Sequence, residues 1–277
     1  MTQVKYFSIL LLLALLFGSC DEKEVMIPEF EQPDSDQVVL VEKLTGVSCP
    51  NCPTGGAELE RMKGQFGDNI AVVSIYTPFL GQPKENSKFD FRTQYGVQIE
   101  DHLGLYLGKP AASINRKLFP GEQYRPIANL GSWASYVLSE LQDFAPLAID
   151  VEHEFNTDSR ELTMDFSITG RDFMEGDFRF TVYVIESGII DPQEHPNGVI
   201  DNYVHNNVLR KVISSVTGDL LSTELSPHES VNRSYSFTLP EEDGWWVAEK
   251  CSIVAFVSER TSESRDVLQT VKFNITD

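Results

Sequence analysis

The chain is short of cysteine and of basic residues. Its 277 residues include 4 cysteines, and 22 lysines and arginines stand against 42 aspartates and glutamates, for a formal charge of -20. Four cysteines are too few for a dense disulfide scaffold in a chain of this length, so each needs its own explanation. The acidic balance repels a phosphate backbone, because no basic cluster offsets it. We therefore expect no nucleic-acid partner.

Long apolar runs are also scarce, and the longest lies near the beginning of the chain. Residues 6–17 are largely apolar and follow Lys5, but this run is shorter than the roughly 20 residues that a membrane-spanning helix needs. Such a run is typical of a signal peptide. It ends in Phe17-Gly18-Ser19-Cys20, which resembles the lipobox at which bacterial lipoproteins are cleaved and acylated. An ordinary secretory signal is the alternative.

The residues around the cleavage point predict a lipid anchor and a tether. We expect a signal peptide at 1–19 and lipid on Cys20, which would attach the protein to a membrane without crossing it. Residues 20–37 are acidic, contain two prolines and lack periodicity, so we expect a solvated tether. The sequence Asp-Glu-Lys-Glu at 21–24 resembles signals that display lipoproteins on the cell surface. A linker without such a signal is the alternative.

Residues 38–145 alternate apolar β-branched runs with helical periodicity. The expected order is a strand at 38–41, the Cys49-Pro50-Asn51-Cys52 motif, a helix through 57–62, a strand at 71–76, a helix at 97–107, a strand entered at Pro110 and a helix capped by Asn129 or Ser132 and closed by Pro146. Continuous apolar strands need cover on both faces, and the helices provide it. This order is typical of a thioredoxin-like domain.

Cys49 and Cys52 are the candidate reactive residues of this domain. At the beginning of a helix, free N–H groups and the helix dipole favour a thiolate at Cys49. Cys52, one turn deeper, is then placed to attack a mixed disulfide. Zinc is disfavoured because two further ligands do not follow nearby. A purely structural disulfide that locks the turn is the other alternative.

Two blocks of sequence resemble a known family. Residues 39–53, with Thr45-Gly46 and the Cys-Pro-Asn-Cys-Pro run, together with Pro110 and the Ile-Asn-Arg at 114–116, resemble the twenty-eight-kilodalton outer-membrane lipoprotein family. Its N-terminal half is thioredoxin-like. Residues 201–210, Asp-Asn-Tyr-Val-His-Asn-Asn-Val-Leu-Arg, also resemble that family's signature. The resemblance implies an outer-membrane lipoprotein of a Gram-negative bacterium, facing the periplasm or exposed on the surface.

The resemblance also implies roles for four residues. Cys49 corresponds to the nucleophile and Cys52 to the resolving thiol. Pro110 corresponds to the cis-proline that faces the pair, and Glu42 stands where thioredoxin-like proteins often keep a buried acid that shuttles protons. The alternatives are an ordinary trans turn proline at Pro110 and a solvated carboxylate at Glu42.

The second half, residues 146–277, has the two-residue period of strands. Residues 147–155 and 162–168 alternate around a turn and predict a hairpin with one solvated face. Further strands are expected at 178–185, 231–239, 251–257 and 267–275. Many short strands without helices between them predict an antiparallel β-sandwich of immunoglobulin-like type. We therefore expect two domains, 38–145 and 146–277.

A long interruption at 188–218 breaks the strand pattern, and we expect it to be irregular. Its acids Asp191 and Asp201 match no calcium-loop spacing, so we expect no metal, and no cofactor is indicated elsewhere. Residues 203–209 are expected to pack this segment against one of the two domains. Cys251, in an apolar β-rich run, is expected to be a small buried core residue.

Two functions remain open. The first is a cell-envelope protein that exchanges thiols and disulfides with protein substrates near the membrane that its lipid enters. The second is a non-catalytic lipoprotein that binds a surface partner or has a structural role, with Cys49 and Cys52 forming a structural disulfide. Fold alone does not choose between them.

Overall fold

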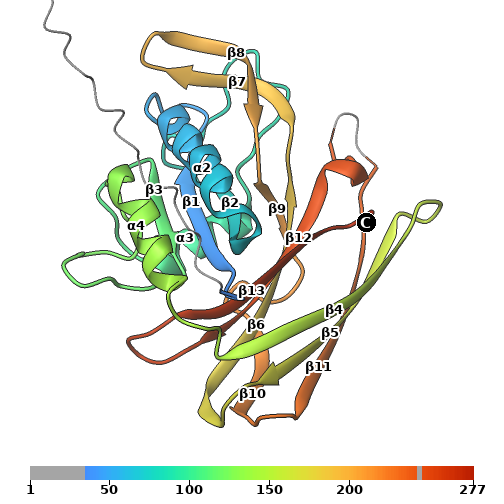
Figure 1. Ribbon diagram of the computed structural model, residues 1–277. Coiled ribbons are helices and arrows are strands. Elements are labelled where there is room, and N and C mark those ends of the chain that lie inside the picture. Colours follow the sequence, from blue (N-terminus) through green and yellow to red (C-terminus); the bar gives the residue numbers. More distant parts are fainter. Residues whose placement is uncertain (1–34, 242–244) are drawn as a thin grey trace, which may run out of the picture. The chain divides into compact units, whose positions relative to one another are not determined.

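The computed structural model describes residues 35–241 and 245–277, and one large sheet connects the two halves of the chain (Figure 1). The expected signal peptide, Cys20 and residues 21–34 of the tether lie outside the described residues. All of the described residues belong to one compact unit. In this part of the chain, no helix is both long enough and apolar enough to cross a membrane.

The large sheet contains eight strands drawn from both halves of the chain. They are β1 (Val39–Thr45), β2 (Ile70–Tyr76), β3 (Ala111–Ile114), β6 (Met174–Glu186), β9 (Val208–Val212), β10 (Asp219–Leu225), β12 (Cys251–Glu259) and β13 (Val267–Asn274). Their order is β13-β12-β6-β9-β2-β1-β3, and β10 also pairs with β6. β1 runs parallel to β2 and antiparallel to β3. β9 joins the halves, because it pairs with β2 on one side and β6 on the other.

Three α-helices cover the β1–β3 end of this sheet. They are α2 (Cys52–Phe66), α3 (Gln94–Leu103) and α4 (Leu130–Glu140), accompanied by short 3₁₀ turns at Gly67–Asn69 and Ala248–Lys250. α2 and α4 pack on one face with Val39 and Val41 of β1, whereas α3 packs on the other with Leu40 and Leu44. The expected cap at Asn129 is confirmed, since its Oδ1 accepts from the Gly131 N–H at 3.2 Å.

The helix expected at 97–107 is wrong at its C-terminal end. α3 ends at Leu103, because Gly104 has a φ of 88° that no helix can contain. Leu107, which the expected helix would have included, is consequently 79% exposed. Ile99, Leu103 and Leu107 recur at intervals of four residues, and this spacing continues past the point where the backbone turns.

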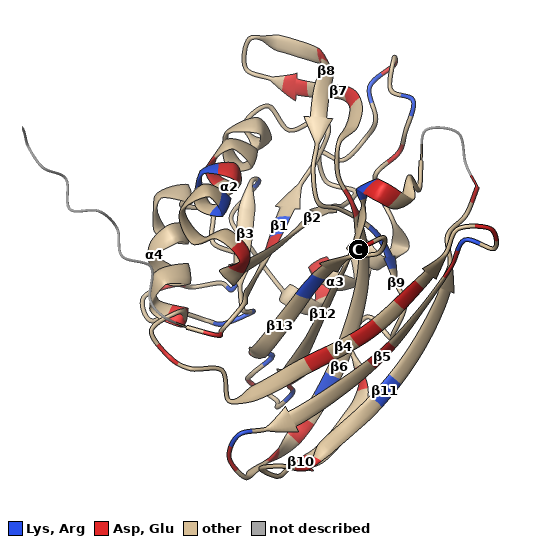
Figure 2. Ribbon diagram, turned by 45° about the vertical axis from the view of Figure 1, so that its right-hand side comes forward, with Lys and Arg blue, Asp and Glu red and all other residues tan. Residues whose placement is uncertain are grey.

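The second sheet has three strands and packs on the β6 and β12 end of the large one. It contains β4 (Leu147–Asn156), β5 (Glu161–Gly170) and β11 (Ser230–Thr238) in the order β11-β5-β4. The expected hairpin is confirmed, with Phe155 opposite Leu162. Its inner residues share a core with β6 and β12, while acidic residues recur along β4 and β5 (Figure 2) at exposed positions of both strands. The immunoglobulin-like strand order stays a prediction.

The prediction that the segment 188–218 is irregular is wrong. It contains β7 (Ile189–His195) and β8 (Gly198–His205), which pair as a hairpin, followed by β9. Pro192 interrupts the pairing, and the register shifts between Asp191 and Gln193, which is why the two-residue period is not visible in the sequence. The hairpin lies over the N-terminal end of α2 (Figure 1).

Candidate functional site

The turn before α2 holds the two cysteines of the motif. Cys49 and Cys52 form a disulfide, with Cα atoms 5.4 Å apart. The Cys52 N–H donates to the Cys49 carbonyl at 3.2 Å, and Pro53 occupies the first turn of the helix, where a missing N–H leaves nothing unpaired. Both cysteines are buried, with exposed fractions of 1% and 2%. The helix N-terminus therefore carries the pair, but almost none of its surface is exposed to solvent.

The β7–β8 hairpin covers this turn. The side-chain amide of Gln193 donates to the carbonyl of Gly46 at 3.2 Å and to that of Cys49 at 3.1 Å. The Glu194 N–H donates to the Val47 carbonyl at 2.8 Å, and the Glu194 carboxylate is paired with Lys84. Sequence analysis missed this cover, since nothing near Gln193 resembles a known motif.

Pro110 lies beside the first turn of α2. Its peptide bond with Lys109 is cis, and a Cβ added at Gly55 would stand 2.8 Å from the Pro110 Cβ. Gly55 thus lets the proline pack against the helix. A groove of about 410 Å³ runs past Pro110, Asn51 and Thr54. The structure therefore brings Pro110 and the cysteine turn to the same end of α2.

Glu42 does not lie with the cysteines. It shares its face of β1 with Leu40 and Leu44, which pack on the side of the sheet opposite to α2. There the Arg116 guanidinium donates to both carboxylate oxygens at 2.8 Å, and the Tyr183 hydroxyl donates at 3.1 Å. Glu42 and Arg116 are fully enclosed. Their arrangement is that of a buried ion pair, and the proton-shuttling role implied for Glu42 stays a prediction.

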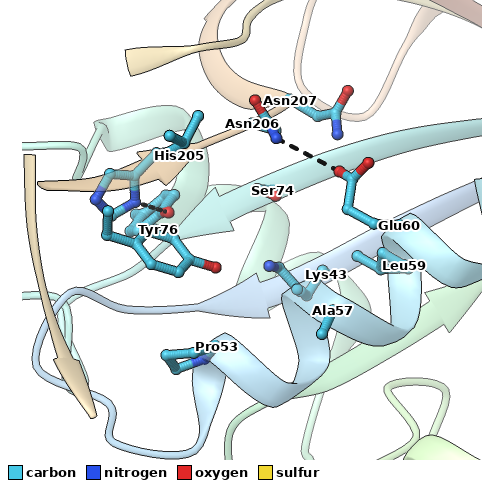
Figure 3. Close-up of a pocket in the computed structure, with 13 residues that line it drawn as sticks. Lys43, Pro53, Ala57, Leu59, Glu60, Ser74, Tyr76, His205, Asn206 and Asn207 are labelled. Carbon is cyan, nitrogen blue, oxygen red and sulfur yellow. Dashed lines mark hydrogen bonds between the residues drawn. The ribbon is translucent and has the colours of Figure 1, made fainter. Parts of the chain in front are cut away.

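The next residue, Lys43, points to the α2 face and into a cavity that sequence analysis missed. The cavity has a volume of about 260 Å³ and lies between α2, the floor of β1 and β2, and the segment 203–207 (Figure 3). Burial lowers the Lys43 pKa to about 8, against the opposing effect of the Glu60 carboxylate. One feature of the sequence could have indicated the cavity. Lys43 lies on the same face as Val39 and Val41, in a strand that was otherwise expected to be buried.

His205 closes one end of this cavity as a neutral group. Its Nδ1 accepts from the Tyr76 hydroxyl at 2.7 Å, and its Nε2 lies 3.2 Å from the Asp191 carbonyl, to which it donates. Burial lowers the His205 pKa to about 4. Both ring nitrogens are thus committed to the fold, and the imidazole forms a wall of the cavity.

Comparisons with known proteins support the envelope assignment and the fold. The model of a family described as outer membrane protein Omp28 matches residues 98–277. The structure of HBP35 of Porphyromonas gingivalis is similar, with a TM-score of 0.67 and 17% identity over 88% of this chain and 76% of that one. Protein AGR_C_4864 from Agrobacterium tumefaciens gives a TM-score of 0.51 and 11% identity over 88% and 97% of the two chains. No curated protein matches. At these identities the two structures show a similar fold and nothing about activity.

Proposed function

Because the chain belongs to the family of outer membrane protein Omp28, it is an outer-membrane protein of the Gram-negative cell envelope, and we propose that it is a lipid-anchored binding protein whose Cys49–Cys52 disulfide is structural. In this proposal the thioredoxin-like elements β1, α2, β2, α3, β3 and α4 serve as a scaffold. The lipid is carried by Cys20, at the end of the signal peptide, and residues 20–37 form the tether.

The burial of both cysteines is the observation that carries this proposal. Thiol–disulfide exchange requires a thiolate to reach one sulfur of the disulfide. Cys49 and Cys52 are only 1% and 2% exposed, and the turn that holds them is bonded to Gln193 and Glu194 of β7. A disulfide enclosed in this way persists in an oxidising compartment and stabilises the fold.

Thiol–disulfide exchange is a second candidate, favoured by the position of Pro110. The groove past Pro110, Asn51 and Thr54 leads along the first turn of α2. An extended substrate segment in this groove would approach the cysteines if the β7–β8 hairpin moved away. This function requires a conformational change, whereas the structural role requires none.

Reduction of insulin by the full-length acylated protein separates the two functions. With dithiothreitol as the electron donor, we expect the rate to equal the background without protein. The Cys49→Ser variant should give the same rate. A rate well above background that is lost in Cys49→Ser would overturn the structural role and establish exchange.

A further inference from the structure

The cavity beside α2 is built from both halves of the chain. Its lining residues are Lys43, Pro53, Gly56, Ala57, Leu59, Glu60, Ser74, Tyr76, Tyr203, Val204, His205, Asn206 and Asn207. The last five belong to the 201–210 stretch, which neither proposed role of the cysteines uses. A Cβ at Gly56 would stand 2.7 Å from the Tyr203 hydroxyl and 3.7 Å from Lys43 Nζ. The absence of a side chain at Gly56 therefore keeps this space open.

Lys43 brings an uncompensated charge into the cavity. The residue is 6% exposed, yet within residues 35–241 and 245–277 its ammonium makes no hydrogen bond or ion pair. Glu60, the nearest acid that influences it, is instead paired with Lys63 at 3.2 Å. An ammonium that is largely withdrawn from water and has no acceptor is unfavourable. A ligand that supplies acceptor oxygens would remove this penalty.

Two further polar groups face the same space without partners. Among the described residues, neither the Tyr203 hydroxyl nor the Asn207 side-chain amide has a hydrogen-bond partner, although Asn207 is only 4% exposed. Figure 3 shows Asn207 and Lys43 on opposite sides of the cavity, with His205 at one end. The hydroxyl and the amide can both donate to an anion. His205 cannot add charge, because its nitrogens are already bonded and it is neutral.

Charge and size define the class of ligand. Among the described residues that line the cavity, Lys43 is the single cation, and Glu60 lies at its side, so a singly charged anion is favoured over a doubly charged phosphate. Pro53, Ala57 and Leu59 give the cavity an apolar wall, which an inorganic ion would leave uncovered. The volume of about 260 Å³ lies below the range of drug-sized pockets.

We propose that this cavity binds a small organic monocarboxylate with a short apolar body. The ammonium of Lys43 holds the carboxylate, the Tyr203 hydroxyl, which faces the same point above Gly56, donates to it, and the apolar body lies against Pro53 and Ala57. The inference specifies a ligand for the binding role proposed above and rests on that role. Exchange activity is measured separately at the cysteines, so failure of ligand binding leaves the result of the insulin assay unaffected.

Calorimetric titration of the full-length protein tests the proposal with three probes. Butyrate carries the carboxylate and an apolar body, butyramide is its neutral isostere, and inorganic phosphate is the multiply charged control. We expect butyrate to bind at least about tenfold more tightly than either of the others, which corresponds to one lost charge-assisted interaction. Equal affinity for butyrate and butyramide, or no butyrate binding in the millimolar range, would overturn the proposal.

Butyrate affinity measured in substituted proteins tests whether the ligand binds in this cavity. Lys43→Met should weaken butyrate binding at least about tenfold, whereas Lys117→Met, outside the cavity, should leave it unchanged. Gly56→Ala provides an independent test should Lys43→Met fail to fold, because the added methyl group enters the cavity. Its matched control is Gly64→Ala in the same helix, where nothing lies within 4 Å of the added Cβ. Wild-type butyrate affinity in Gly56→Ala would overturn the proposal.

Discussion

The side-chain amide of Gln193 donates to the carbonyl oxygen of Cys49 over 3.1 Å, so a strand from the second half of the chain closes the turn that carries the disulfide. The same amide also bonds the Gly46 carbonyl. Access to the cysteines therefore depends on the β7–β8 hairpin, whose Gln193 lies 144 residues after Cys49 in the chain. Loss of the Gln193 amide should therefore weaken the cover over the disulfide.

Gln193→Ala should loosen the hairpin and expose the disulfide. It leaves the carbonyl groups of Gly46 and Cys49 buried without their donor, which we expect to lower the free energy of unfolding by about 1–3 kcal/mol. Dithiothreitol should then reduce the disulfide faster than in the wild type. Urea titration and thiol release measure the two effects. Gln98→Ala, at an exposed position of α3, is the control and should change neither.

Replacing both Cys49 and Cys52 by alanine should destabilise the fold without unfolding it. The disulfide closes a loop of a few residues, for which chain entropy gives about 2 kcal/mol. Urea unfolding of the double variant should show this loss, and fully reduced wild type should show the same loss. A variant as stable as the oxidised wild type would show that the disulfide has no stabilising role.

Removing one partner of the buried Glu42–Arg116 pair should be strongly destabilising. Glu42→Gln leaves the enclosed Arg116 guanidinium without a counter-charge, and we expect a loss of about 3–5 kcal/mol. Glu58→Gln is the control, because its partner Arg61 is half exposed and such pairs contribute less than about 1 kcal/mol. Chemical denaturation of both variants makes the comparison. Equal effects would contradict the burial of the pair.

Stability should fall in mild acid because His205 is buried in its neutral form. Burial lowers its pKa to about 4, below the ordinary value of about 6.5 that applies in the unfolded chain. The unfolded state therefore takes up the proton first, and stability is lost as the pH falls from 6.5 towards 4. For this group the loss reaches about 2 kcal/mol at pH 5.

Urea titrations at pH 7.5 and pH 5 measure this dependence. His205→Gln should reduce the difference between the two pH values, whereas His228→Gln, at an exposed position, should leave it unchanged. An identical pH difference in wild type and His205→Gln would show that His205 is not the group responsible. His102 should contribute in the same direction, since burial lowers its pKa to about 3.

Cys20→Ser should abolish lipid attachment. In cells supplied with radiolabelled palmitate, the wild type should carry label and sediment with the outer membrane. The variant should be unlabelled and should appear in the soluble fraction of the envelope. Cys251→Ser is a control for labelling, because Cys251 is buried and its thiol pKa is raised to about 12, chiefly by burial. Label retained in Cys20→Ser would exclude Cys20 as the acceptor.

Local patterns in the sequence predicted several elements in both halves of the fold. The Cys-Pro-Asn-Cys motif lies at the beginning of a helix, Pro110 precedes a strand, and β4 and β5 pair as the expected hairpin. These features depend on neighbours in sequence, such as proline at a helix start or strict alternation, and for that reason short windows contain them.

Relationships across long separations were not predictable. β9 pairs with β2 through Ser74 and Val208, and so joins strands from both sides of residue 146 in one sheet. The ligand cavity and the cover over Cys49 arise from the same placement of residues 189–212. A single sequence does not reveal which strands pair, and the prolines and glycines of this segment concealed its two-residue period.

The rate at which dithiothreitol reduces the Cys49–Cys52 disulfide in the folded protein tests the structural role most directly. If the hairpin seals the pair, reduction in native buffer should be at least about a hundredfold slower than in the urea-unfolded protein, because it must wait for opening of the covering segment. It should accelerate as urea is added. Reduction in native buffer as fast as in the unfolded chain would contradict the account, since it would place an accessible, exchange-competent disulfide at the start of α2.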